Sequence, residues 1–322
     1  MKARIYRSSQ RELQCKIVDS GEIVTATAKG SILKKSSIVV GDYVQLEKVD
    51  VGTGFEYLIA SIEPRESLIF RNFPRERKKK SIAANVDLIV VVVTVSKPDY
   101  KRGLLDRYLM RAFQWKVPTI VVFNKMDQYD PGKFDLEFES RRVAHLDVDT
   151  YEITAKDISY TPKVLDNGMV EFEEVLSGKT AIFLGQSGAG KSKIVSALSG
   201  GEISLLSKEL AKVGKGAHTT TWSEILEFKD FTIIDSPGIR SFSMDDVMSE
   251  DIDQFFPDVA EWATHCQFKD CSHDQKAREC FFYRPDLDSE TDSEIALSRL
   301  ESYLRIKEEL ERDPSWKKRK GH

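Results

Sequence analysis

Short β-prone runs separated by turn residues fill the chain up to about Asn72. The runs extend over Leu13 to Val18, Ile23 to Ala28, Ile38 to Leu46 and Tyr57 to Ile62. Apolar and β-branched runs of this length, bounded by Gly, Asp, Ser and Thr, are typical of strands. About five short strands in so small a region predict an all-β barrel of the OB type, and an SH3-like barrel would give almost the same pattern.

After Ser81 the pattern changes to apolar runs that alternate with helical stretches. The apolar runs are Leu88 to Val95, Thr119 to Phe123, Ala181 to Leu184 and Phe231 to Ile234. Between the first two, one face of the chain is apolar at helical spacing, with Leu104, Leu105, Tyr108, Leu109 and Ala112. Buried strands alternating with helices predict an α/β domain with a mainly parallel sheet.

From about Met244 the strand pattern ends. An acidic stretch, Asp245 to Asp258, leads into a cluster of cysteines, and Ser293 to Leu310 has the apolar spacing of a helix. The pattern therefore predicts a multidomain chain with three parts. These are an all-β domain over residues 1–72, an α/β domain over 73–243, and a mostly helical domain over 244–322 with a basic tail.

Composition and charge are those of a soluble globular protein. Of 322 residues, 41% are hydrophobic and 31% charged, and the net charge is only -4. A nucleic-acid partner would therefore be bound by local patches such as the basic linker Arg71 to Lys80. The longest apolar run, Leu88 to Val93, is far shorter than the roughly 20 residues that span a bilayer, and the N-terminus has no apolar signal core. We expect a cytoplasmic monomer with no membrane partner.

A glycine-rich loop separates the third apolar run of the α/β region from a helical stretch. Its sequence follows the pattern GxxxxGKS of phosphate-binding loops, in the strand-to-helix context that such a loop requires. Its residues are Gly185, Gln186, Ser187, Gly188, Ala189, Gly190, Lys191 and Ser192. Backbone N–H groups of the loop bind phosphate oxygens, Lys191 reaches the β and γ phosphates, and Ser192 ligates magnesium. A kinase, an ATPase and a GTPase all remain possible from this loop alone.

A second motif selects the base. Asn124, Lys125 and Asp127 form an NKxD pattern at the end of the run Thr119 to Phe123. A carboxylate there accepts two N–H bonds from the guanine edge, whereas adenine would leave it unpaired. The stem of Lys125 can lie along the base. Thr154 and Ala155 follow the next strand and supply the small-residue loop whose backbone would touch the guanine carbonyl.

The remaining phosphate contacts are expected from two later segments. Asp235 to Gly238 forms a DxxG motif after the run Phe231 to Ile234, which offers a carboxylate for the magnesium shell and a glycine N–H for the γ-phosphate. Upstream, the glycine-flexible segment Gly214 to Thr221 carries three threonine hydroxyls, as a switch loop must. We expect one of these threonines to ligate magnesium.

Two features distinguish this chain from ordinary GTPases. The guanine motif precedes the phosphate loop, whereas ordinary GTPases begin with the phosphate loop, so the domain is circularly permuted. The segment after DxxG consequently continues directly into the C-terminal region. We therefore expect a nucleotide-driven movement of the DxxG segment to be transmitted along the chain to that region. In addition, Ile239 occupies the place where many GTPases carry the glutamine that orients the attacking water, so unassisted hydrolysis should be slow.

The cysteine cluster predicts a metal site. Cys266, Cys271, His273 and Cys280 are the ligand types of a closed zinc site with three cysteines and one histidine, whereas Cys15 stands alone. Binding of one structural zinc ion would contribute folding free energy to a short, acidic segment in which we expect little apolar core.

Taken together, these residues resemble the RsgA (YjeQ) family of bacterial circularly permuted GTPases, which act in maturation of the small ribosomal subunit. The resemblance covers nearly the whole chain. It is carried by the nucleotide motifs in permuted order, by the cysteine cluster, and by Gly41 to Val44, Arg65 to Arg71, Ala84 to Asp87, Leu105 to Leu109, His218 to Thr221, and Ile239 with Arg240.

The resemblance implies an N-terminal OB-fold, a central GTPase domain, a C-terminal zinc domain, and GTP hydrolysis strongly stimulated by the small subunit. It also implies that His218 replaces the missing glutamine and that Thr220 is the magnesium-ligating switch threonine. The chain departs from the family pattern in several places: six residues separate His273 from Cys280 where five are usual, Phe281 and Phe282 follow, Ser236 replaces a threonine, and Ala217 precedes His218.

The function hypothesis is a GTPase whose affinity for the small ribosomal subunit and its rRNA depends on whether GTP or GDP is bound, with hydrolysis triggering release. Two alternatives remain open, a passive RNA-binding scaffold that uses the GTP site only for stability, and a P-loop kinase. Retention of Lys191, Ser192 and Asp235 argues against the scaffold, and Asp127 argues against an ATP-using kinase.

Overall fold

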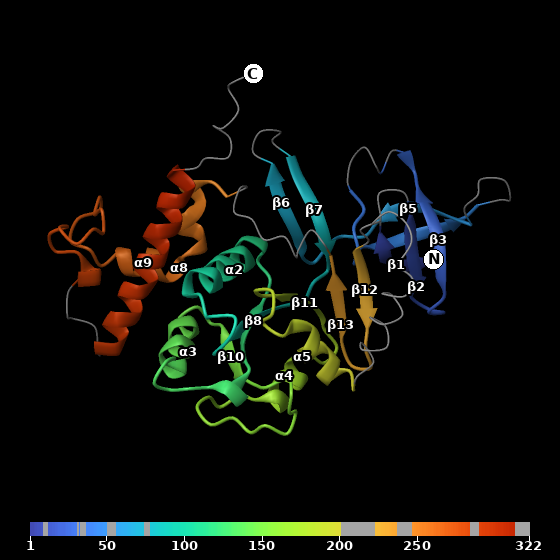
Figure 1. The fold of residues 1–322 in the computed structure, drawn as a ribbon. Coiled ribbons are helices and arrows are strands. Elements are labelled where there is room, and N and C mark those ends of the chain that lie inside the picture. Colours follow the sequence, from blue (N-terminus) through green and yellow to red (C-terminus); the bar gives the residue numbers. More distant parts are fainter. Residues whose placement is uncertain are drawn as a thin grey trace, which may run out of the picture.

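The structure is a computed structural model that describes residues 1–8, 12–30, 32, 37–49, 56–73, 78–200, 223–236, 247–283 and 290–312. Three parts lie next to one another (Figure 1): the N-terminal strands in blue, an α/β region in green and yellow with two later strands in orange, and a helical C-terminal region in orange and red. The α/β region lies between the other two.

The N-terminal strands form the expected barrel. The strands are β1 (Lys2–Ser8), β2 (Leu13–Ile17), β3 (Ile23–Ala28), β4 (Tyr43–Lys48) and β5 (Tyr57–Ile62). They pair in the order β1-β2-β3-β5-β4, and a β1–β4 pairing closes the barrel. Alternate residues of β1, such as Ala3 and Ile5, are fully buried, because one face of each strand lines the interior. The OB-type barrel is thus confirmed.

Arg71 and Lys78 to Lys80 of the basic run predicted as a linker are instead part of a β-hairpin, which corrects that prediction, while Arg75 and Arg77 lie outside the described residues. Strands β6 (Leu68–Phe73) and β7 (Lys78–Ala84) pair as a separate antiparallel sheet with Arg71 opposite Lys80. Ile69 and Ala83 are fully buried and hold one face of the hairpin against the core, which a charge count could not reveal. The division predicted at residue 72 falls inside β6 and stays a prediction.

The α/β region has the parallel sheet that its apolar runs predict. Its strands are β8 (Leu88–Thr94), β9 (Thr119–Asn124), β10 (Asp149–Glu152), β11 (Thr180–Leu184), β12 (Ser223–Glu227) and β13 (Thr232–Asp235). Its helices are α2 (Arg102–Trp115), η1 (Met126–Gln128), α3 (Leu136–Ala144), α4 (Met169–Leu176) and α5 (Lys191–Leu198). Five strands are parallel in the order β10-β9-β8-β11-β13, and β12 is antiparallel to β13.

Burial on both faces explains why these strands are apolar throughout. Ile89 and Val91 of β8 belong to a core cluster with α2 and α3, whereas Leu88, Val90 and Val92 belong to a second cluster with α4 and α5. Because successive side chains of a strand point to opposite faces, a continuous apolar run is required where helices cover both.

The barrel and the α/β sheet are continuous. In the described residues, an 11-stranded sheet has the order β10-β9-β8-β11-β13-β12-β1-β2-β3-β5-β4. The junction is the antiparallel pairing of β12 with β1, which places Glu224 opposite Arg7 and Ser223 opposite Ser8. The N-terminal barrel is therefore attached to the α/β region through a strand ladder as well as through the chain.

The C-terminal region is helical, as expected. Its elements are η2 (Ser249–Phe255), α8 (Pro257–Ala263), η3 (Phe281–Tyr283) and α9 (Glu290–Arg312). The expectation of little apolar core was wrong, because a buried cluster includes Ile252, Phe256, Phe282 and Leu300 together with Met110 of α2. Within the described residues, no helix is both long and apolar enough to cross a membrane.

Four buried charges join the C-terminal region to the α/β region. Asp106 of α2 accepts two hydrogen bonds from Arg142 of α3, at 2.9 and 2.7 Å, and one from Arg299 of α9. Arg299 also binds Asp258 of α8 through two hydrogen bonds. The four side chains are at most 2% exposed, so each charge depends on its partners for compensation. Burial alone would raise the pKa of Asp106, but Arg142 and Arg299 outweigh it and hold that pKa below its usual value.

Asp106→Ala should lower the free energy of unfolding by about 3–5 kcal/mol, because Arg142 then loses its buried carboxylate partner. Urea unfolding at neutral pH, where Asp106 is ionised, measures the loss. The control is Arg141→Ala, which breaks the exposed 3.0 Å pair between Arg141 of α3 and Asp292 of α9 and should cost less than about 1 kcal/mol. Equal losses for the two variants would contradict a special role for the buried cluster.

Candidate active site and metal centre

The nucleotide motifs all lie at one edge of the parallel sheet. Strands β8, β9, β10, β11 and β13 run in the same direction, so their carboxyl ends meet at that edge. NKxD follows β9, Thr154 follows β10, the phosphate loop follows β11, and Asp235 ends β13. The structure thus brings together motifs that are up to about a hundred residues apart in the sequence.

The phosphate loop depends on its glycines. Gly185, Gly188 and Gly190 have φ values of 144°, 81° and 101°, which side chains rarely allow. A Cβ on Gly185 would lie 2.3 Å from the Val92 carbonyl oxygen, so alanine is also excluded there by space. Helix α5 begins at Lys191, and the Nζ of Lys191 donates to the carbonyl oxygens of Gly185 and Gln186 at 2.6 and 3.1 Å.

Asn124 ties three of the motifs together. Its Nδ2 donates to the Ala189 carbonyl of the phosphate loop at 2.9 Å, and its Oδ1 accepts from the Ala155 N–H at 3.1 Å. The side chain is buried, with 1% exposure. A Cβ on Gly190 would lie 2.3 Å from the same Nδ2, so this glycine also makes room for the amide.

Lys125 extends from the base motif across the phosphate loop. Its backbone is left-handed, with φ of 69°, and its Nζ donates to the carbonyl oxygens of Gly188, at 2.9 Å, and Lys97. Burial, and then the charge of Lys193, lowers the pKa of Lys125. The aliphatic stem is thereby held along the space next to Asp127 and the phosphate loop.

Asp127 is held by the loop after β10. Its Oδ1 accepts a hydrogen bond from the Thr154 hydroxyl at 2.9 Å, and its Oδ2 accepts one from the Lys156 Nζ at 2.7 Å. Burial acts to raise the pKa of Asp127, but these hydrogen bonds outweigh it and lower that pKa. At neutral pH the group is a carboxylate that can only accept hydrogen bonds. The sequence motif predicts only a backbone role for Thr154 and does not indicate that Lys156 is a partner of Asp127.

The two switch segments are described only at their ends. Asp235 ends β13, and the hydroxyl of the following Ser236 lies 2.8 Å from that of Ser223, the first residue of β12. Ser236 is 2% exposed. His218, Thr220, Gly238 and Ile239 lie outside the described residues.

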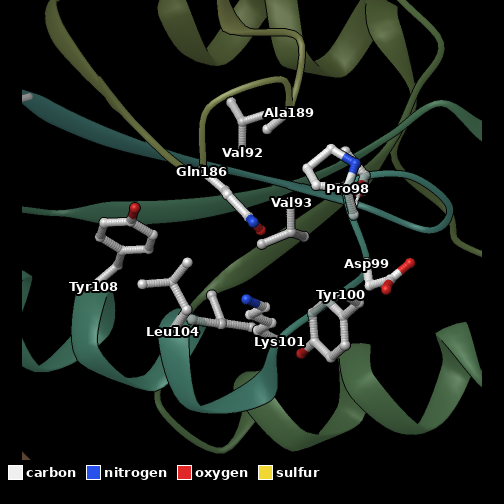
Figure 2. Close-up of a pocket in the computed structure, with 12 residues that line it drawn as sticks. Val92, Val93, Pro98, Asp99, Tyr100, Lys101, Leu104, Tyr108, Gln186 and Ala189 are labelled. Carbon is white, nitrogen blue, oxygen red and sulfur yellow. Dashed lines mark hydrogen bonds between the residues drawn. The ribbon is translucent and has the colours of Figure 1, made fainter.

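A pocket adjoins the phosphate loop on the side of α2 (Figure 2). Val93 of β8, Pro98, Leu104 and Tyr108 line it, and Gln186 extends into it from the phosphate loop. The sequence analysis did not predict this pocket, because its walls come from four separate segments. Its place beside Gln186 and Ala189 makes it an extension of the phosphate-binding region.

Four ligand atoms converge in the C-terminal region. The donor atoms of Cys266, Cys271, His273 and Cys280 all lie within 4.8 Å of one another. The Cys266 and Cys280 Sγ atoms are 3.6 and 3.7 Å from the His273 Nδ1 and 4.0 Å from each other. Neighbouring ligand atoms around tetrahedral zinc lie roughly 3.5–3.8 Å apart, so the donor set fits zinc.

The segment between the last two ligands turns at two left-handed residues. His273 has a φ of 54° and Glu279 one of 56°. Phe282 packs edge-on against His273, with ring centroids 5.3 Å apart. Burial, and then the neighbouring thiols of Cys271 and Cys266, raises the pKa of Cys280 to about 12. Thiolates at this place would be stabilised by a bound cation such as zinc.

A phosphate loop and a guanine motif at one sheet edge, supplied in reversed chain order, define the class of circularly permuted P-loop GTPases. The comparison with known proteins agrees with this assignment. A family model described as RsgA GTPase matches residues 62–245. The chain belongs to the RsgA GTPase family and is a GTP-hydrolysing enzyme.

Relatives extend the match to most of the chain. It is 31% identical over 319 residues to the small ribosomal subunit biogenesis GTPase RsgA of Azobacteroides pseudotrichonymphae genomovar. CFP2, covering 97% of each protein. It is 32% identical over 284 residues to the protein of that name from Bacteroides fragilis, covering 86% of this chain and 88% of the relative.

Solved structures show the same arrangement. The crystal structure of YjeQ from Thermotoga maritima superposes with a TM-score of 0.67 at 25% identity, over 96% of this chain and 98% of the other. YloQ, described as a circularly permuted GTPase, gives a TM-score of 0.66 over 96% and 94% of the two chains. At 21% identity that second likeness concerns the fold alone.

Cys271→Ser should reduce bound zinc from about one equivalent to well below it, because a closed four-ligand site is opened. Elemental analysis of protein purified without chelator measures this. Cys15→Ala, which changes a cysteine in the barrel core, is the control and should retain the zinc. Because α9 is held by the buried ion cluster, loosening should be confined to residues 264–283. Zinc well below one equivalent in the parent protein would count against the site.

Proposed function

We propose that this GTPase is stimulated by the small ribosomal subunit, acts late in the assembly of that subunit, and leaves it when GTP is hydrolysed. The observation that carries the proposal is the Asn124 amide, which locks the guanine motif to the phosphate loop in a chain whose relatives are named for small-subunit biogenesis. We further propose three domains, over residues 1–72, 73–243 and 244–322, and action as a monomer in the cytoplasm.

The geometry supports specific roles around the nucleotide. Asp127 accepts the two N–H bonds of the guanine edge in place of the bond from the Lys156 ammonium, and the backbone of the loop at Thr154 and Ala155 contacts the guanine carbonyl. Backbone N–H groups of the phosphate loop and Lys191 hold the phosphates. Ser192, Thr220 and Asp235 are the proposed magnesium shell, with the Gly238 N–H on the γ-phosphate.

Hydrolysis needs a group that orients water. Ile239 has no polar atom and cannot supply it, so we assign that task to His218, whose imidazole can accept a proton of the water. His218 belongs to the segment Gly214 to Thr221, which contains two glycines. A contact with the subunit that fixes this segment would therefore raise the rate, which accounts for stimulation.

Recognition of rRNA is assigned in part to the β6–β7 hairpin. Arg71 of β6 lies directly opposite Lys80 of β7. Lys79, also in β7, has its ammonium 3.7 Å from the centre of the Phe70 ring. Phosphate groups of an RNA backbone are the ligand that this basic face fits. The barrel and the zinc region are proposed as the other RNA-binding surfaces.

GTP turnover should rise at least about tenfold when purified small subunits are added, because the subunit would fix the segment that carries the water-orienting His218. Phosphate release is measured with and without subunits. Lys191→Ala is the control, because it removes the positive charge on the β and γ phosphates and should abolish turnover under both conditions. Turnover that small subunits leave unchanged would favour the passive scaffold.

A further inference from the structure

An ion pair lies at the only ladder between barrel and α/β sheet that the described residues contain. The Arg7 guanidinium of β1 donates from Nε and Nη2 to Oε2 of Glu224 in β12, at 2.9 and 2.5 Å. Arg7 and Glu224 are themselves the paired positions of the two strands. The side chains are only 34% and 19% exposed, so water screens this pair less than it screens a pair on the open surface.

The strand that Arg7 contacts, β12, begins just after one switch segment, and it pairs with β13, which ends where the other switch segment begins. Ser223 begins β12 directly after the segment Gly214 to Thr221 and Trp222, and Glu224 lies opposite Asp235 of β13. The hydroxyls of Ser223 and Ser236 are 2.8 Å apart. The β12–β13 unit is therefore fixed to the barrel on its outer edge and to the nucleotide motifs at its end. Figure 1 shows β12 between β13 and the barrel.

Further contacts join the barrel to the α/β region at Gly41 and Arg4. A Cβ on Gly41 would lie 2.1 Å from the Ala84 carbonyl oxygen, and the Nδ2 of Asn85 donates to the Gly41 carbonyl at 2.9 Å. Arg4 of β1 donates to the Thr180 hydroxyl of β11 at 2.9 Å. The barrel is therefore attached at its base as well as through the β1–β12 ladder.

We propose that Arg7 is a positioning residue which, through Glu224, couples what the barrel binds to the Asp235 end of the nucleotide site. This deepens the proposed function, since stimulation by the small subunit is the event that the coupling would transmit. Coupling between two sites is reciprocal, so the nucleotide must also change the stability of β1. Serine at position 236, where the family has threonine, keeps the hydroxyl that bonds Ser223.

A first test needs no ribosomal subunits. Amide hydrogen exchange of β1 is compared with GDP and with a non-hydrolysable GTP analogue bound. In the parent protein the exchange rate of β1 should differ between the two nucleotides at least about fivefold, the lower end of usual coupling. Arg7→Leu should remove the difference. Identical β1 exchange in the two nucleotide states of the parent would overturn the proposal.

The matched control is Lys16→Leu. Lys16 of β2 pairs with Glu227 at the opposite end of β12, where Glu227 lies opposite Thr232 and far along the strand from Asp235. The Lys16–Glu227 pair also joins the barrel to β12. Its removal therefore tests whether any weakening of the contact between barrel and β12 is enough to abolish the nucleotide-dependent difference. The nucleotide-dependent difference in β1 exchange should persist in Lys16→Leu. Its loss there would assign the coupling to general docking and overturn the role of Arg7.

A second test separates this inference from the proposed function. With small subunits, Arg7→Leu should lower the stimulated kcat at least about fivefold while the subunit concentration for half-stimulation and the unstimulated rate stay within about twofold. The exchanged pair, Arg7→Glu with Glu224→Arg, should restore the kcat. Full stimulation in Arg7→Leu would overturn the inference but leave the proposed function intact. Absent stimulation of the parent would overturn the proposed function, and hydrogen exchange would still decide the coupling.

Discussion

A single buried amide holds the nucleotide site together. Asn124 donates to the phosphate loop through Ala189 and accepts from the base loop through Ala155, so loops after three different strands meet at one side chain. Gly190 must lack a Cβ, because the amide nitrogen occupies that space. The bonds depend on where the strands lie in the sheet and not on the order in which the chain supplies them, which is why the site tolerates circular permutation.

The permutation has different consequences for the two flanking regions. The C-terminal region follows the DxxG motif in the chain, but the buried cluster of Asp106, Arg142, Arg299 and Asp258 fixes it to α2 and α3. The barrel is attached through β12, which begins beside the Asp235 end of β13.

Sequence patterns predicted those parts of the structure that depend on neighbouring residues. The phosphate loop, the NKxD motif and the apolar runs are local, and the OB-type barrel followed from its strand spacing. Contacts between distant residues could not be predicted. Asp106 and Arg299 are 193 positions apart, and the β1–β12 pairing joins residues more than 200 positions apart. The prediction of a linker around Arg71 was wrong, because the composition of a basic run does not reveal that residues at its two ends pair as strands. The apolar core of the C-terminal region was missed because its members are spread thinly from Val247 to Ile306.

The central claim is that the guanine site described here is the site that the small subunit stimulates. Asp127→Asn tests it most directly, because an asparagine amide can donate to the 2-carbonyl of xanthine but cannot accept both N–H bonds of guanine. Release of phosphate from xanthosine triphosphate is measured for this variant with and without purified small subunits. The account predicts stimulation of at least about tenfold with xanthosine triphosphate and loss of stimulated GTP hydrolysis. The account would be contradicted if the variant hydrolysed GTP as fast as the parent, or if added subunits left its turnover of xanthosine triphosphate unchanged.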